Sequence, residues 1–167
     1  MTPTHYYAIV DTAIGPISIS VNSQGDVTEI YTRDSRDRFQ SNPGYLQDDA
    51  LVQPVAQQII EYARGERKIF DVKLNPSGTE FQKKVWELLI HIPFGETRTY
   101  GQLAAELGNP NASRAVGRAN ATNPISIIVP CHRVIGASGD LTGYAGGLDM
   151  KQRLLTLEGI LKPSLFG

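Results

Sequence analysis

The apolar residues of this 167-residue chain change their spacing at one point, the sequence Asn75-Pro76-Ser77-Gly78. Before this break, short runs that alternate apolar and polar residues predict strands. After it, apolar residues spaced three and four apart predict helices. Proline and glycine favour turns because proline fixes φ and glycine tolerates φ angles that other residues avoid. We therefore predict two small domains of mixed α/β (α+β) class, residues 1–75 and 76–167.

The first half predicts a three-stranded antiparallel sheet with one helix. Strand patterns separated by turn residues occur at 7–10, 17–21 and 27–31. Residues 32–48 are polar, charged and interrupted by Pro43-Gly44, which predicts a loop. Residues 52–64 have apolar side chains at helical spacing and predict an amphipathic helix, and residues 70–74 predict a short strand.

The second half is predicted to be mainly helical. Thr79 with Gln82, and Thr99 with Gln102, have the spacing of capping boxes, in which both side chains bind N–H groups at the start of a helix. The first box opens a helix whose predicted buried stripe is Phe81, Val85, Trp86, Leu88, Leu89 and Ile92. The last helix is predicted over about residues 148–161.

The second capping box opens a short helix that ends near Gly108. A tight turn follows, and then a further helix over about residues 112–120. Two short helices joined in this way are typical of a helix-turn-helix. Such pairs are also common in helical packing, so the pattern alone leaves both interpretations open.

Charge is unevenly distributed along the chain. The net charge of −1 argues weakly against nucleic-acid binding. Residues 1–78 hold ten acidic and seven basic residues, net −3, whereas residues 79–135 hold four and six, net +2. The middle of the chain is thus the best place for a phosphate backbone, although ordinary surface variation explains the contrast equally well. No apolar run approaches the ~20 residues of a membrane span, and no signal-peptide pattern opens the chain. We expect no membrane contact and a cytoplasmic location.

The chain has one cysteine, Cys131. One cysteine excludes an internal disulfide and a cysteine-rich zinc cluster, and the three histidines have no metal-ligand spacing, so we expect no metal. Cys131 is either a buried structural residue or a reactive thiol. A free thiol has a pKa near 8.5 and only the thiolate is a strong nucleophile, so a reactive cysteine needs a neighbouring base or cation. His132 and Arg133 follow it directly, although neighbours in sequence need not face each other.

The motif Pro130-Cys131-His132-Arg133-Val134 resembles the active-site signature of the 6-O-alkylguanine-DNA alkyltransferases, also called methylated-DNA–protein-cysteine methyltransferases. Further segments resemble that family in the same order over residues 79–160, namely 94–96, 99–100, 113–117, 123–124, 143–147 and 157–159. The first half resembles the family's N-terminal domain only in size and pattern. The resemblance implies a ribonuclease-H-like N-terminal domain and a C-terminal domain with a helix-turn-helix.

The resemblance implies direct reversal of DNA damage. The substrate would be 6-O-alkylguanine in double-stranded DNA, flipped out of the helix, and its alkyl group would pass to Cys131 once per protein molecule. No cofactor or metal is implied, and the protein is expected to be a monomer in solution. Whether 4-O-alkylthymine is also repaired, and whether the protein loads cooperatively on DNA, stays open.

The family roles fall on five catalytic positions. Cys131 would be the nucleophile, with its sulfur ionised beside the imidazole of His132. His132 would act as its base through a water molecule, and Glu158 would orient His132. Asn123 would brace a hinge before the active-site strand, and Tyr100 would donate a proton to guanine N3. Ordinary packing, turn or surface roles are the alternatives for each of these polar residues.

The same resemblance places DNA contacts on the two short helices. Arg114 would fill the place of the flipped base, while Thr99 and Tyr100 contact DNA at the start of the first helix. Ala115 and Gly117 are small, which would let the second helix enter the minor groove. The substrate pocket would be formed by Tyr144, Ala145 and the backbone of Val134 and Ile135. Many family members carry Ser where Ala145 stands, so the resemblance implies that one possible hydrogen bond to the substrate oxygen is absent here.

Two other classes of protein compete with this interpretation. A thiol hydrolase or acyltransferase could use Cys131, His132 and Glu158, and it would turn over esters or amides. It leaves Arg114 and the helix pair unexplained. A DNA-damage-binding protein of the same fold without transferase activity is the other alternative, but relatives of that kind have lost the cysteine that this chain keeps.

Overall fold

The computed structural model describes residues 2–141, 144 and 146–162. Its contacts divide the chain into two units at Ser77 and Gly78, and a short segment of the second half, Pro124–Ser126, belongs to the first unit. The mixed α/β fold class predicted from the sequence is confirmed.

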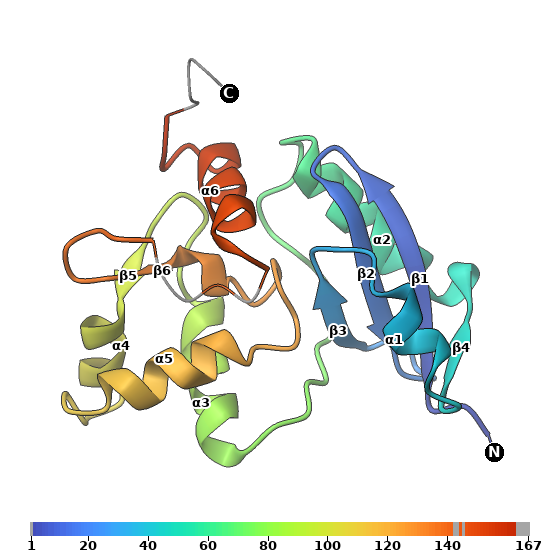
Figure 1. The fold of residues 1–167 in the computed structure, drawn as a ribbon, viewed down its shortest axis with the longest axis horizontal. Coiled ribbons are helices and arrows are strands. Elements are labelled where there is room, and N and C mark those ends of the chain that lie inside the picture. Colours follow the sequence, from blue (N-terminus) through green and yellow to red (C-terminus); the bar gives the residue numbers. More distant parts are fainter. Residues whose placement is uncertain (1, 142–143, 145, 163–167) are drawn as a thin grey trace. The chain divides into compact units, whose positions relative to one another are not determined.

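The first unit is built on a four-stranded sheet with the order β3-β2-β1-β4 (Figure 1). The strands β1 (His5–Thr12), β2 (Gly15–Val21) and β3 (Val27–Tyr31) are antiparallel, as predicted. The helix α2 (Asp49–Ala63) packs on β1 and β2. It begins earlier than predicted, because the carboxylate of Asp48 accepts a hydrogen bond from the Leu51 N–H group. The core consists of completely buried side chains, among them Ile17, Ile19, Val21, Ile30, Val52, Ile59 and Tyr62.

The predicted loop at residues 32–48 is wrong in part. It contains the short helix α1 (Arg36–Gln40) and the strand β4 (Tyr45–Gln47), which pairs in parallel with β1 and adds a fourth strand. Phe39 of α1 is fully buried, and its ring lies 4.9 Å from that of Tyr7 and 5.2 Å from that of Tyr45. The composition of this segment is polar, and it did not reveal that Phe39 packs on Tyr7 of β1, which is distant in sequence, and on Tyr45 of β4.

The predicted strand at residues 70–74 is also wrong. Only Leu74 pairs, in a single bridge to Val27. The side chain of Gln58 instead holds residue 71 through two hydrogen bonds, one to its N–H group and one to its carbonyl.

The second unit contains the helices α3 (Glu80–Ile90), α4 (Tyr100–Glu106), α5 (Ser113–Ala121) and α6 (Leu148–Leu157). Both predicted capping boxes are present at α3 and α4. A parallel pair of two-residue strands, β5 (Arg98–Thr99) and β6 (Val134–Ile135), joins the start of α4 to the segment after Cys131 (Figure 1). The final helix stops before the predicted end, since Gly159 adopts a φ of 80° that ends helical geometry.

The helices of this unit pack around α3 and α5. The indole N–H of Trp86 donates a hydrogen bond of 2.8 Å to the carbonyl of Ala119 on α5. Leu103 and Ala104 of α4 are buried, as is Val116 of α5, and these two helices contact each other. Of the predicted buried stripe, Val85, Trp86 and Leu89 of α3 are buried, as is Ile92 just after the helix. Leu88 is only half-buried, and Phe81 is 39% exposed in the first turn.

The segment that leads to Cys131 is not the predicted strand. Ile30 of β3 donates to the carbonyl of Pro124 and accepts from the N–H group of Ser126 at 2.9 and 3.1 Å. Pairing ends there because Ile127 has a φ of 73°, which is uncommon for a β-branched residue. The chain then turns, and the 3₁₀ helix η1 (Cys131–Arg133) carries the cysteine.

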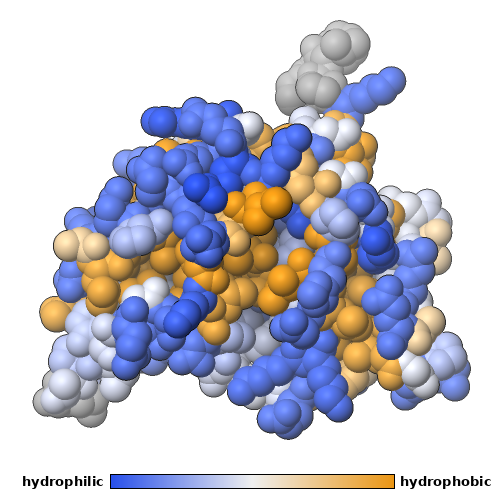
Figure 2. Space-filling model, turned by 180° about the vertical axis from the view of Figure 1, so that it is seen from behind, coloured by the Kyte–Doolittle hydropathy of each residue, from blue (hydrophilic) through white to orange (hydrophobic). Residues whose placement is uncertain are grey.

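One face of the molecule has a surface of mixed polarity. Figure 2 shows a face on which charged and polar side chains are interspersed with apolar ones. Within the described ranges, no helix is both long enough and apolar enough to cross a membrane.

Candidate active site

Cys131 is the first residue of η1 and is 3% exposed. Pro130 precedes it, and the carbonyl of Pro130 accepts a hydrogen bond from the Arg133 N–H group, which closes the turn. The amide of Asn120 donates to the Cys131 carbonyl at 3.4 Å. Directly after η1, Val134 and Ile135 pair with Arg98 and Thr99, so the turn is tied to the start of α4. The thiol therefore lies in a turn fixed by backbone hydrogen bonds on both sides.

His132 and Glu158 form a buried pair. The imidazole Nε2 lies 2.5 Å from Oε2 of Glu158, and neither side chain is exposed. Because Nε2 faces a carboxylate, we assign the imidazole hydrogen to Nε2 and the lone pair to Nδ1. Nδ1 is buried and has no hydrogen-bond partner among the described residues. A buried imidazole with an available lone pair is suited to accept a proton from a water or a thiol.

Arg133 completes this cluster, and the sequence did not predict its part in it. Its guanidinium donates to both carboxylate oxygens of Glu158, with Nε 2.8 Å from Oε1 and Nη2 3.1 Å from Oε2. Its third nitrogen, Nη1, donates to the carbonyl of Ile92 at 2.6 Å, and the guanidinium lies over the ring of Phe94. Arg133 lies inside the cysteine motif, and this position was the available signal for its role. A charged side chain that is buried needs a partner.

The charges of this cluster shift two pKa values. Burial opposes ionisation of Glu158, but its hydrogen bonds and charge interactions with His132 and Arg133 outweigh burial and lower its pKa to about 2. Burial lowers the pKa of His132, and the charges of Arg133 and Lys151 act in the same direction, while Glu158 acts against them. At neutral pH, the pair is therefore an ionised carboxylate beside a neutral imidazole.

The sulfur of Cys131 is not ionised at rest, in contrast to our expectation. Burial raises the pKa of its thiol to about 11. A side-chain hydrogen bond from Asn123 and the charge of Lys151 lower it, but they do not offset the burial. Free Cys131 therefore carries its proton at neutral pH, and the neighbouring base becomes necessary for reaction rather than merely helpful.

Lys151 is a second residue of the site that the sequence did not single out. It lies on α6 and is completely buried, and its ammonium donates to the carbonyl of Val134 at 2.5 Å. Burial lowers its pKa to about 8, while Cys131 raises it. Lys151 lies three and four residues before Leu154 and Leu155, so all three are on the core face of α6. This helical spacing was the available signal in the sequence.

Among the other predicted catalytic and pocket residues, Asn123, Val134 and Ile135 adjoin this turn. The Asn123 amide donates to the Val129 carbonyl at 2.9 Å and so braces the segment before Cys131. Tyr144 and Val134 are buried, and Ile135 is half-buried. Ala145 lies outside the described residues, so the expectation about its missing hydroxyl stays a prediction.

The predicted DNA-contacting residues meet at the α4–α5 pair. The ring of Tyr100 packs against Gly117, where an added Cβ atom would lie 3.8 Å from it. Arg114 is exposed in the first turn of α5, and Thr99 and Ala115 are half-exposed. Because Thr99 belongs to β5, this helix pair is connected directly to the strand that follows the cysteine turn.

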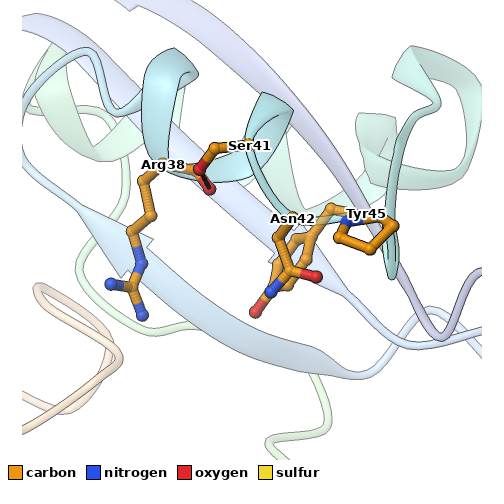
Figure 3. A pocket seen from close by; sticks show the side chains of 5 residues that line it. Arg38, Ser41, Asn42 and Tyr45 are labelled. Carbon is orange, nitrogen blue, oxygen red and sulfur yellow. Dashed lines mark hydrogen bonds between the residues drawn. The ribbon is translucent and has the colours of Figure 1, made fainter.

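A separate pocket lies in the first unit. Its lining consists of Arg38, Ser41, Asn42, Pro43 and Tyr45, and Figure 3 shows these side chains at α1 and β4. Arg38 and Tyr45 both hydrogen bond to the buried carboxylate of Glu29, at 3.2 and 2.6 Å. This pocket contains no nucleophile with a base, so it is not the candidate active site.

A buried cysteine, a base with its lone pair available and an orienting carboxylate form the arrangement of an enzyme with a cysteine nucleophile, in the same unit as a short helix pair. Residues 80–160 match the family model described as the DNA-binding domain of 6-O-methylguanine DNA methyltransferase. The chain is 51% identical over 154 residues to the methylated-DNA–protein-cysteine methyltransferase of Methanosarcina acetivorans, which covers 92% of this chain and 98% of that relative. It is 46% identical over 157 residues to the protein of the same name from Mycobacterium tuberculosis, with 92% of both chains covered.

The solved structures agree with these relatives. The crystal structure of Mycobacterium tuberculosis OGT in complex with DNA superposes with a TM-score of 0.83 at 44% identity, over 92% of each chain. This chain belongs to the methylated-DNA–protein-cysteine methyltransferase family.

Proposed function

We propose that this protein repairs alkylated DNA by direct reversal, transferring the alkyl group of 6-O-alkylguanine to the sulfur of Cys131. The observation that carries the proposal is the unpartnered Nδ1 atom of His132, in a turn shared with the lone cysteine and backed by Glu158. Family membership supports the substrate class, since the relatives are named for methylated DNA and for a protein cysteine.

The transfer is a displacement at the alkyl carbon. The Cys131 thiol gives its proton through a water molecule to Nδ1 of His132, and Glu158 stabilises the imidazolium. The sulfur attacks the alkyl carbon, a sulfur–carbon bond forms, and the bond from carbon to guanine O6 breaks. The electron pair of that bond stays on the guanine, which takes a proton at N3 from the Tyr100 hydroxyl. The imidazolium proton then restores Tyr100, so the thiol proton ends on the guanine.

Thiol ionisation and alkyl transfer are coupled in this mechanism. Because the pKa of Cys131 is about 11 at rest, only a very small fraction of the thiol is ionised at neutral pH, and transfer depends on removal of its proton. The ammonium of Lys151 stabilises the developing negative charge. Asn123 keeps the turn in place by its bond to Val129. The same resting state makes the sulfur unreactive toward other electrophiles.

Access to the thiol requires a flipped nucleotide. The alkylated oxygen lies on the major-groove edge of a stacked guanine, where a cysteine held in a buried turn cannot reach it in line. The exposed Arg114 in the first turn of α5 is placed to fill the vacated position, and the small Ala115 and Gly117 allow α5 to approach the minor groove. Tyr144 and the backbone of Val134 and Ile135 form the pocket for the extruded base, and Ala145, which the sequence assigns to the same pocket, lies outside the described residues.

The reaction is stoichiometric and needs no cofactor. The thioether formed on Cys131 is chemically inert, so each molecule transfers one alkyl group. We assign DNA binding and transfer to residues 76–167 and a structural role to residues 1–75. The protein acts on double-stranded DNA as a cytoplasmic monomer.

Mass spectrometry after mixing with a duplex that contains 6-O-methylguanine tests this proposal. We expect one methyl group on the Cys131 peptide, a plateau at one group per molecule and none in Cys131→Ala. Duplex binding without any transfer would favour a damage-binding protein, and sustained turnover of esters would favour a thiol hydrolase. A parallel duplex with 4-O-methylthymine decides whether that base is a second substrate.

A further inference from the structure

The carboxylate of Glu158 is saturated with donors. Oε1 accepts from Nε of Arg133 and from the N–H group of Gly95, and Oε2 accepts from Nη2 of Arg133 and faces Nε2 of His132. A carboxylate offers about four acceptor sites, so this one has no site left. Arg133 supplies two of the four bonds and is itself held to the carbonyl of Ile92. The carboxylate thus cannot rotate without breaking several bonds.

Burial disfavours a proton on His132, and the buried charges around it add to this effect or oppose it. Glu158 and Arg133 neutralise each other, so a neutral imidazole leaves the cluster without net charge. A proton on His132 would add an unbalanced positive charge in a site where the ammonium of Lys151 is also buried. If Arg133 were uncharged, the whole charge of Glu158 would be available to an imidazolium. The charged and titratable groups that face His132 are Glu158, Arg133, Lys151 and Cys131.

We propose that Arg133 is a positioning residue for alkyl transfer, because it engages the carboxylate of Glu158 and so keeps His132 neutral, with its lone pair on Nδ1. This inference rests on the proposed function. Arg133 touches neither substrate nor sulfur in this role and acts only through the histidine. Its planar fork matters for the geometry of the carboxylate, and its charge matters for the protonation state of the base.

The sign of the effect follows from the charge. Removal of the positive charge stabilises the imidazolium and raises the pKa of His132. At low pH, more of the protein then holds a protonated histidine that cannot accept the thiol proton. At high pH, the histidine is neutral with or without Arg133. A charge-removing substitution therefore moves the acid side of the pH–rate profile to higher pH, whereas loss of packing alone lowers the rate equally at every pH.

Two variants separate charge from geometry. Arg133→Gln removes the charge and keeps a donor, and Arg133→Lys keeps the charge and removes the fork. Both are made with His5→Gln and His91→Gln, which leave His132 as the sole imidazole. The measurements are single-turnover methyl transfer from pH 5 to 9 and the titration of the His132 ring by NMR.

For Arg133→Gln we expect the His132 titration and the acid side of the rate profile to move upward together. Each unit of upward shift lowers the rate on the acid side about tenfold. Arg133→Lys should keep the midpoint of the parent protein, whatever its rate. A uniform loss of rate in Arg133→Gln, with an unchanged profile and an unchanged His132 titration, would overturn the proposal.

The parent protein with Arg133 intact supplies a test that needs no substitution in the cluster. Its His132 ring should stay neutral, with the hydrogen on Nε2, at pH values well below the ordinary histidine pKa of about 6.5. A ring that titrates at the ordinary value refutes the role of Arg133 even if the variants do not fold. If instead Cys131 is never alkylated, the proposed function fails, while the NMR titration still reports on Arg133.

Discussion

Burial at single residues sets the chemistry of the site. Cys131 and Lys151 are both taken out of water, which disfavours the charged form of each, and each is the partner that makes the other's charge more favourable. His132 and Glu158 are related in the same way, with Arg133 as a third member. The resting site therefore holds a neutral thiol and a neutral imidazole beside the charged Glu158, Arg133 and Lys151, and ionisation of the sulfur is left to the reaction.

Glu158 makes stability depend on acidity. Its folded pKa of about 2 lies below the unfolded value of about 4.3, so its contribution is complete above pH 4.3 and is lost as pH falls toward 2. The lowered pKa of His132 adds a loss that begins below about pH 6.5, since the unfolded chain then binds the proton more tightly. We expect chemical denaturation of the parent protein to show stability falling throughout this range.

The substitution Glu158→Gln isolates the carboxylate. It leaves the buried Arg133 without a counterion, which should destabilise the protein by about 3–5 kcal/mol at pH 7. The acid-induced loss of stability between pH 4.3 and 3 should become shallower than in the parent protein. An equal slope in both proteins over that interval would contradict the lowered pKa of Glu158.

The sequence could predict the cysteine and its histidine, but not the whole cluster. The cysteine motif identified Cys131 and His132, and the family resemblance of segment 157–159 identified Glu158. Lys151 and the fork of Arg133 were missed because their roles come from burial, which depends on tertiary packing. The ionisation state of the sulfur was predicted incorrectly for the same reason.

At the scale of elements, local signals were sufficient where a helix or strand is defined by its own residues. The two capping boxes and the strands β1 to β3 were found because spacing and turn residues specify them. The strand β4 and the turn η1 were not found. β4 forms because it can pair with the edge of β1. η1 follows from two nearby prolines and from the unusual φ of Ile127, and no local sequence pattern predicts that φ.

The helix α2 contains a proline away from its first turn. Pro54 is exposed and cannot donate the backbone hydrogen bond that the Ala50 carbonyl would accept. We expect Pro54→Ala to stabilise the protein by about 1–3 kcal/mol, with methyl transfer unchanged. Thermal unfolding is the measurement, and Gln53→Ala is the matched control on the same exposed face. A melting temperature no higher than that of the control would show that α2 has already accommodated the proline.

The helix α5 permits a test of the proposed groove contact. Gly117→Ala should stabilise the helix by up to about 1 kcal/mol, because its new Cβ atom meets only ordinary contacts at the Tyr100 ring. The same methyl group should weaken duplex binding, if α5 lies close to the groove. Gly101→Ala on α4 is the control for helix propensity. Equal duplex affinities of the two variants in an anisotropy titration would argue against the minor-groove role of α5.

At the scale of the whole molecule, net charge limits how strongly salt affects DNA binding. The chain has a net charge of −1, and its excess of basic residues is confined to the middle of the sequence. We expect a shallow dependence of the logarithm of the association constant on the logarithm of salt concentration. A slope steeper than about −7, which corresponds to eight phosphate contacts, would contradict this expectation.

The short segment Pro124–Ser126 lies in the second half of the sequence but belongs to the first unit. Its register is set by Ile30 of β3, in a half that supplies none of the proposed reactive groups. Five residues beyond Ser126 the chain reaches the sulfur. We therefore expect substitutions that disturb the backbone of β3 at Ile30 to lower alkyl transfer to Cys131, although they lie far in sequence from every proposed reactive group.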